Sequence, residues 1–177
     1  MEAQRTRRAG DDRSRHRGRH SLIPHNNTKN GGSEAKYGRF LGPIYRDHNF
    51  LMTKTRARDF SAAQRDLEES LRCLRTDHLD LWQMHSVESP EDVDRRRRDG
   101  VFQVTEETKK SGKTRPIGFT GYRTPTAHRL FLGETDQFET CQMPINAADP
   151  QLQELNQECP ASAYGKEPGR PRNENSC

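Results

Sequence analysis

The chain has 177 residues, enough for one domain of ordinary size, but only 29% of them are apolar and 32% are charged. Such a small apolar share argues against a large core, and we expect part of the chain to remain unfolded. No apolar run approaches the roughly 20 residues of a membrane helix, and the four cysteines form no CxxC pair. These features exclude a membrane-spanning protein, a zinc site and a disulfide framework, and they favour a cytoplasmic protein with reduced thiols.

Residues 1–32 carry the densest positive charge and are predicted to be disordered. Arginine, glycine, aspartate, histidine and asparagine dominate the segment, with one brief apolar patch at Leu22–Pro24. The basic residues between Arg5 and His20 leave a second interpretation open, an arm that binds nucleic acid through its phosphates. Out-of-frame translation of a GC-rich gene gives the same composition, so we do not expect a nucleic acid partner.

From residue 33 onward, strand-like and helix-like segments begin to alternate. Phe50–Lys54 is predicted to be a strand. The next helix is expected to begin at Ser61, which with Gln64 forms a capping box, and its apolar residues recur at helical spacing: Ala63, Leu67, Leu71 and Leu74. Leu79–His85 is short, apolar and almost free of charge, as a buried parallel strand is.

The second half of this region continues the alternation. A helix is predicted within Glu91–Lys110, divided at Gly100, followed by a strand at Pro116–Thr120. A short helix at Thr126–Leu132 and a strand at Phe138–Ile145 complete the pattern. This order indicates right-handed βαβ units and a parallel sheet.

Two of the predicted strands end on a polar side chain, Lys54 and His85. The carboxyl ends of parallel barrel strands commonly carry the reacting groups, so both are candidates for chemistry. Trp82 and Met84 alternate with His85 and are expected to face the helices, while Asp80 is expected to cap or form a salt bridge. The run 95–98, four arginines flanked by acidic residues, is predicted to be a solvated helix face.

Five sequence blocks resemble the aldo/keto reductases in order and spacing: GGSEAKYGRFLG at 31–42, LMTKT at 51–55, SLRCLRTDHLDLWQMHS at 70–86, GKTRPIGFTGYR at 112–123 and CQMPIN at 141–146. The resemblance implies an α/β fold, a partial (β/α)8 TIM barrel of about four parallel strands over residues 33–157. It also implies NADP(H) as cofactor and a small aldehyde or ketone as substrate. Residues 158–177 are rich in proline, glycine and polar side chains and are predicted to be a disordered tail.

The resemblance assigns roles to five residues. Lys54 and His85 match the family's catalytic lysine and histidine, which lower the pKa of a proton-donating tyrosine and orient the substrate carbonyl. Thr120 and Gln142 match residues that hold the nicotinamide, and Asn146 is expected to line the same rim. No metal site is implied.

The sequence departs from the family where its tyrosine and aspartate are expected, upstream of Ser33. Thr28 stands near the tyrosine position and Ile23 near the aspartate position, so both acids are missing. A closed barrel needs about 250 residues, and the first two and the last strands are not recognisable. We expect a truncated or frameshifted copy with impaired activity. A non-catalytic interaction protein derived from a reductase is the alternative, and open sheet edges would favour self-association.

Overall fold

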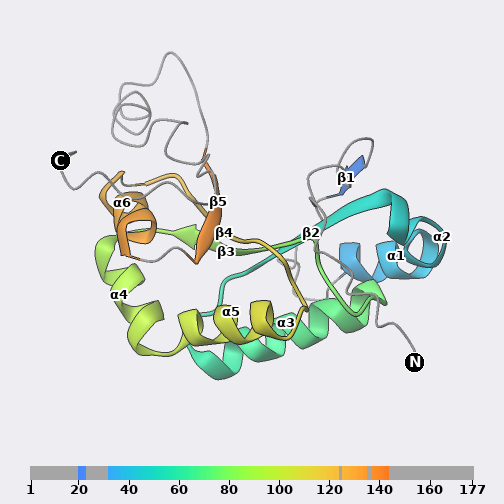
Figure 1. Ribbon diagram of the computed structural model, residues 1–177, viewed down its shortest axis with the longest axis horizontal. Helices are drawn as coiled ribbons and strands as arrows, with labels where there is room; N and C mark the ends of the chain where they lie inside the picture. Colours follow the sequence, from blue (N-terminus) through green and yellow to red (C-terminus); the bar gives the residue numbers. More distant parts are fainter. Residues whose placement is uncertain (1–19, 23–31, 124, 135–136, 144–177) are drawn as a thin grey trace, which may run out of the picture.

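The protein is a parallel five-stranded sheet whose strands follow one another in chain order. The computed structural model describes residues 20–22, 32–123, 125–134 and 137–143 (Figure 1). The strands are β1 (His20–Leu22), β2 (Asn49–Thr55), β3 (Leu81–Val87), β4 (Ile117–Gly121) and β5 (Phe138–Gln142). All neighbouring pairs are parallel, and the described residues form an open sheet with β1 and β5 at its edges. The predicted α/β class with a partial barrel is confirmed.

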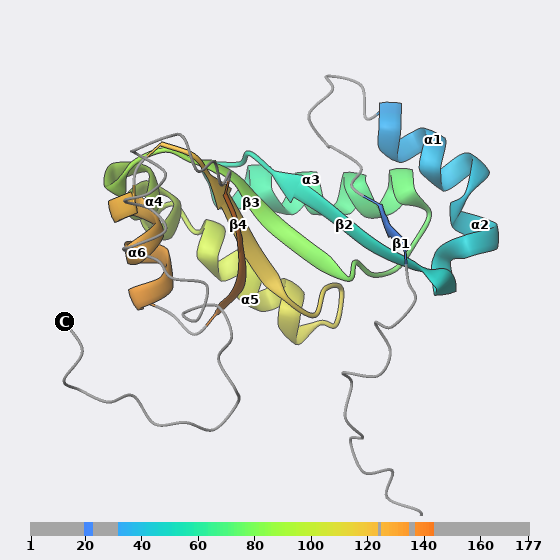
Figure 2. The same ribbon diagram turned by 90° about the horizontal axis from the view of Figure 1, so that it is seen from above.

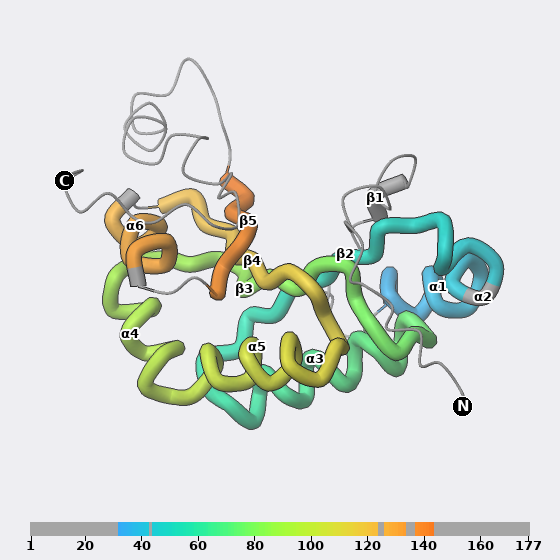
Figure 3. Tube along the Cα trace, viewed as in Figure 1, coloured from blue at the N-terminus to red at the C-terminus, as the bar shows by residue number. Residues whose placement is uncertain are grey.

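Helices make every connection between strands. The helices are α1 (Gly32–Phe40), α2 (Gly42–Tyr45), the 3-10 helix η2 (Arg46–His48), α3 (Phe60–Leu74), α4 (Pro90–Arg98), α5 (Val101–Lys110) and α6 (Pro125–Glu134). Figure 1 shows α3 and α5 side by side beneath one face of the sheet. The tube in Figure 3 shows α1 and α2 at one end of the sheet, α3 and α5 beneath it, and α4 and α6 at the other end. None of the helices in the described ranges combines the length and apolar character needed to cross a membrane.

Strand β1 comes from the segment that we expected to be disordered. Its backbone pairs His20 with Asn49 and Leu22 with Leu51, on the edge of β2 (Figure 2). A strand of three residues needs only a neighbouring edge and no core of its own, which composition does not reveal. In the structure these three residues form a strand, and disorder in the rest of the segment stays a prediction. The rest of segment 1–31 and the predicted tail 158–177 lie outside the described residues.

The N-cap of helix α3 lies two residues earlier than its capping pattern suggested. Asp59 is the N-cap, and its carboxylate accepts a hydrogen bond of 2.8 Å from the Ala62 amide. The prediction of Ser61 as the cap is wrong, because extended Asp59 already satisfies the first turn. The predicted apolar stripe is buried, as expected: Ala63, Leu67, Leu71 and Leu74.

A glycine separates α4 from α5, as predicted. Gly100 has φ +86°, a left-handed conformation that side chains rarely adopt. A Cβ there would also lie 3.1 Å from the Cβ of Phe60. The chain can therefore turn between the two helices while staying close to the start of α3.

The two faces of the sheet have different surroundings. Trp82 and Met84 of β3 and Phe119 of β4 are buried in the hydrophobic core, which confirms the prediction for the first two. The residues that alternate with them, such as His85 and Thr120, project from the opposite face, which we call the inner face. The predicted role of Asp80 is also confirmed, because it forms a 2.9 Å salt bridge with Arg46.

Candidate active site

Four of the five predicted site residues gather at the carboxyl ends of consecutive strands. Lys54 lies in β2, His85 in β3, Thr120 in β4 and Gln142 in β5. Asn146, the fifth, lies outside the described residues. The four side chains form two hydrogen-bonded pairs on the inner face. The fold thus brings together four predicted site residues that are far apart in the sequence.

The first pair joins opposite parts of the sheet. The Lys54 Nζ donates a 2.8 Å hydrogen bond to the Gln142 Oε1. Strands β3 and β4 lie between β2, which carries Lys54, and β5, which carries Gln142. In a flat sheet the backbones of β2 and β5 would be roughly 14 Å apart. The bond therefore depends on the sheet curling toward its inner face, as a barrel wall does.

The environment of Lys54 is unusual for a lysine. The residue is only 7% exposed. Within the described residues, its amino group donates a hydrogen bond to Gln142. Burial lowers the pKa of Lys54, because the dry surroundings penalise the charged form. Since Gln142 itself is exposed, the Lys54 amino group lies at the rim of the site.

The second pair orients the histidine. The His85 Nδ1 lies 2.8 Å from the Thr120 Oγ1, and the same hydroxyl oxygen accepts a hydrogen bond of 3.1 Å from the Ser86 amide. The ring of His85 is thus tied to β4. A substrate carbonyl bound at this rim would meet a positioned imidazole beside the amino group of Lys54.

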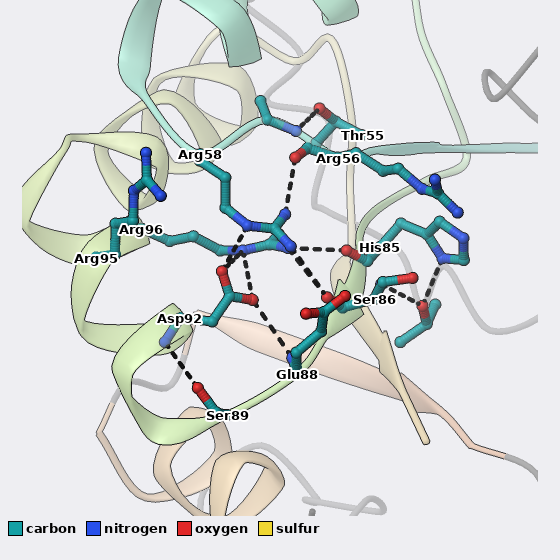
Figure 4. Close-up of polar contacts among 12 residues, drawn as sticks. Thr55, Arg56, Arg58, His85, Ser86, Glu88, Ser89, Asp92, Arg95 and Arg96 are labelled. Carbon is teal, nitrogen blue, oxygen red and sulfur yellow. Dashed lines mark hydrogen bonds and ion pairs between the residues drawn. The ribbon is translucent and has the colours of Figure 1, made fainter. Parts of the chain in front are cut away.

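A buried arginine supports the end of β3, and it corrects one prediction. Arg96, in the run expected to form a solvated face, is 0% exposed. Its Nη2 donates to the His85 carbonyl at 2.8 Å and to the Ser86 carbonyl at 3.3 Å (Figure 4). Ser86 has a left-handed backbone with φ 52°, so these bonds fix a strained residue directly after the histidine.

Two arginines share one carboxylate in this cluster. Asp92 lies 2.5 Å from the Arg58 Nε and 3.3 Å from the Arg96 Nε (Figure 4). Burial and the charge of Arg58 lower the pKa of Arg96 to about 10, which still leaves it charged at neutral pH. Helical spacing could have indicated the burial of Arg96, because Val93 is buried three positions earlier on the same face of the helix.

The sequence also gave no sign of a buried carboxylate behind the site. Glu34 is 0% exposed, and its Oε1 accepts a 2.6 Å hydrogen bond from the Thr53 hydroxyl. The hydroxyl groups of Thr53 and Ser70 both lower the pKa of this carboxylate, but by less than burial raises it. Burial raises the pKa of Glu34 because water cannot stabilise its charge.

A groove at the other end of the sheet is less suited to chemistry. This groove of about 680 Å³ is lined by Arg46, Glu68, Leu71, Arg72, Arg75, Thr76, Asp77 and Lys113. Three of its cations are paired with carboxylates: Arg46 with Asp80, Arg72 with Glu69, and Lys113 with Glu68. Throughout the described ranges, no three His, Cys, Asp or Glu side chains are placed to hold a metal ion. The inner-face rim is therefore the candidate active site.

Several solved structures that are similar in fold to this chain are aldo-keto reductases. The holo enzyme of Bacillus halodurans is 23% identical over 78% of this chain and 49% of its own, with a TM-score of 0.63. The enzyme of Klebsiella pneumoniae, solved with NADP and acetate, is 24% identical over 71% of this chain and 42% of its own, with a TM-score of 0.54. The enzyme of Bombyx mori, solved with NADP, is 18% identical over 78% of this chain and 48% of its own, with a TM-score of 0.60.

The sequence comparisons identify the family. A comparison with curated proteins gives no match. The chain spans about half the length of the solved structures that it resembles. The sequence model of the Aldo/keto reductase family matches residues 28–161, which include the whole site described above. The chain therefore belongs to the aldo/keto reductase family.

Proposed function

We propose that this chain binds NADP(H) and a small aldehyde or ketone, and that reduction of the carbonyl group is the function its geometry supports best. One observation carries the proposal: Lys54, His85, Thr120 and Gln142 meet in two hydrogen-bonded pairs at the carboxyl ends of four consecutive strands. In parallel α/β barrels, this end of the sheet is where substrates and catalytic groups lie. Family membership supports the same reaction class.

The donor set at the rim suits the nicotinamide end of the cofactor. Gln142 is exposed and carries an amide, which can both donate to and accept from the nicotinamide carboxamide. Thr120 lies on the neighbouring strand in register with Gln142, and Asn146 is proposed as a third contact. The reductases of Klebsiella pneumoniae and Bombyx mori, solved with NADP, support this choice of cofactor. When bound, the nicotinamide would supply the hydride.

The proton for the carbonyl oxygen must then come from this chain. No tyrosine contacts Lys54 within the described residues, where its hydrogen bond goes to Gln142. His85 is therefore the proposed acid, with the imidazole held in place by Thr120, and the amino group of Lys54 is proposed to orient the carbonyl beside it. Because these groups replace a dedicated tyrosine, we expect turnover to be slow.

The test is NADPH oxidation by the full chain with a reactive aldehyde such as 4-nitrobenzaldehyde. We expect slow aldehyde-dependent oxidation that falls at least about tenfold in Lys54→Met and in His85→Ala, the usual scale for loss of an acid-base group. Lys36→Met is the matched control, because Lys36 is exposed on α1. Oxidation that is absent, or unchanged in both site variants, would refute the proposal and favour a non-catalytic role.

We also propose that the open sheet allows self-association. Strand β5 is an edge of the described sheet, and an uncovered edge offers unpaired backbone groups to another chain. Light scattering over a range of protein concentrations tests this, and a mass that stays at one chain throughout would rule it out.

A further inference from the structure

Lys54 differs from the other lysines in the described part of the chain. Lys109, Lys110 and Lys113 form ion pairs with glutamates, and Lys36 is exposed. Lys54 is buried, and its partner is the uncharged amide oxygen of Gln142 at 2.8 Å. An amide oxygen can accept a hydrogen bond from a neutral amine, although the bond from an ammonium group is stronger. The site therefore does not require Lys54 to stay charged, and its burial favours the neutral form.

The surroundings of Lys54 provide what an amine needs to react with a carbonyl group. Gln142 holds one N–H of the amino group, which leaves the nitrogen lone pair directed elsewhere. His85 lies on the neighbouring strand, on the same inner face, one inner-face position beyond the register partner of Lys54, Gln83. An imidazole in that position can carry protons between nitrogen, oxygen and water.

We propose that Lys54 is a Schiff-base lysine that condenses with small aldehydes without any cofactor. The Nζ lone pair attacks the carbonyl carbon, the π electrons of the C=O bond move to oxygen, and a proton passes from nitrogen to oxygen to give a carbinolamine. His85 then protonates the hydroxyl group, the C–O bond breaks with release of water, and the nitrogen lone pair forms the C=N bond of an iminium ion. The iminium nitrogen returns its proton to His85 to give the neutral imine. One amine and one aldehyde give one imine and one water, with no oxidation or reduction.

This activity goes beyond carbonyl reduction and is independent of NADPH. It uses the same carbonyl-binding rim, but hydride transfer plays no part in it. A buried amine of this kind should react selectively at neutral pH, where an exposed lysine remains almost fully protonated.

Reductive trapping tests the proposal. The full chain is incubated at neutral pH with propanal and sodium cyanoborohydride, which reduces imines, and the modified lysines are mapped by mass spectrometry. We expect Lys54 to be propylated at least about tenfold faster than Lys36, because only the neutral amine reacts with the aldehyde. Equal rates at the two lysines would overturn the proposal. His85→Gln should slow trapping at Lys54 and leave Lys36 unchanged.

A nearly isosteric variant separates reactivity from folding. Gln142→Glu places a carboxylate against the amino group, which should hold it as ammonium and reduce trapping at Lys54 by about tenfold or more. Circular dichroism should show the same fold, and Lys36→Arg should leave trapping at Lys54 unchanged. Undiminished trapping in Gln142→Glu would also contradict the proposal. Trapping without NADPH oxidation would refute only the reductase function, and NADPH oxidation with no selective trapping would refute only the Schiff-base lysine.

Discussion

Arg96 offers the sharpest test of how the end of β3 is held, and Arg96→Ala should strongly destabilise the protein. The side chain is 0% exposed and donates to the carbonyls of His85 at 2.8 Å and Ser86 at 3.3 Å. Removing one partner from a buried charged cluster typically costs 3–5 kcal/mol. Two features place this loss of stability at the lower end of that range. Asp92 keeps its contact with Arg58, and the Arg96 Nη1 has no hydrogen-bond partner among the described residues. We therefore expect a loss of about 3 kcal/mol.

Arg95→Ala on the same helix is the matched control. Arg95 is 60% exposed, and its nitrogen lies 3.5 Å from the Asp99 carboxylate. Exposed ion pairs of this type contribute about 0–1 kcal/mol. Urea unfolding followed by circular dichroism gives both free energies of unfolding. If the two variants differ by less than about 1 kcal/mol, Arg96 is no more structural than a surface arginine, and the assignment of its role is wrong.

Two further substitutions test the packing behind the site. Burial holds the pKa of Glu34 above its ordinary value of 4.5, so the folded state retains a proton that the unfolded state has released as pH rises past 4.5. The free energy of unfolding of the wild type should therefore fall as pH rises above about 4.5. Urea unfolding should show Glu34→Gln becoming more stable relative to the wild type over the same range. A difference between the two proteins that does not change with pH would contradict this. Gly118→Ala would place a Cβ 2.1 Å from the Thr140 Oγ1 and 2.8 Å from its carbonyl oxygen, and should cost about 1–3 kcal/mol. Gly133→Ala, with nothing within 4 Å, should not destabilise, and equal losses in the two alanine variants would exclude steric crowding as the cause.

The strands and helices that carry the site could be predicted because their sequence periods are clear. Leu67 and Leu71 recur at helical spacing and are buried, and the apolar strand before His85 forms β3 as expected. The start of α3 was less predictable, because Asp59 and Ser61 are both good caps and only the extended backbone of Asp59 decides between them. Composition cannot reveal a short edge strand such as β1, because its pairing depends on a distant neighbour.

The contacts within the site were beyond reach of the sequence for a different reason. Lys54 and Gln142 are 88 positions apart, and their bond exists only because three pairs of strands curl in one direction. In the arginine run, all four residues have the same chemistry, and the acidic neighbours suggested solvent exposure for each of them. Only the turn of the helix that also buries Val93 selects Arg96 for the interior.

The two buried cations at this end of the sheet meet the cost of burial in different ways. A charge that leaves water without a counter-charge costs several kcal/mol. Arg96 offsets that cost with Asp92 and two backbone carbonyls, and its pKa of about 10 keeps it charged. Among the described residues Lys54 has one amide oxygen instead, and it can avoid the cost by releasing its proton. The arginine is therefore suited to hold the backbone that carries His85, and the lysine is suited to act as a nucleophile beside it.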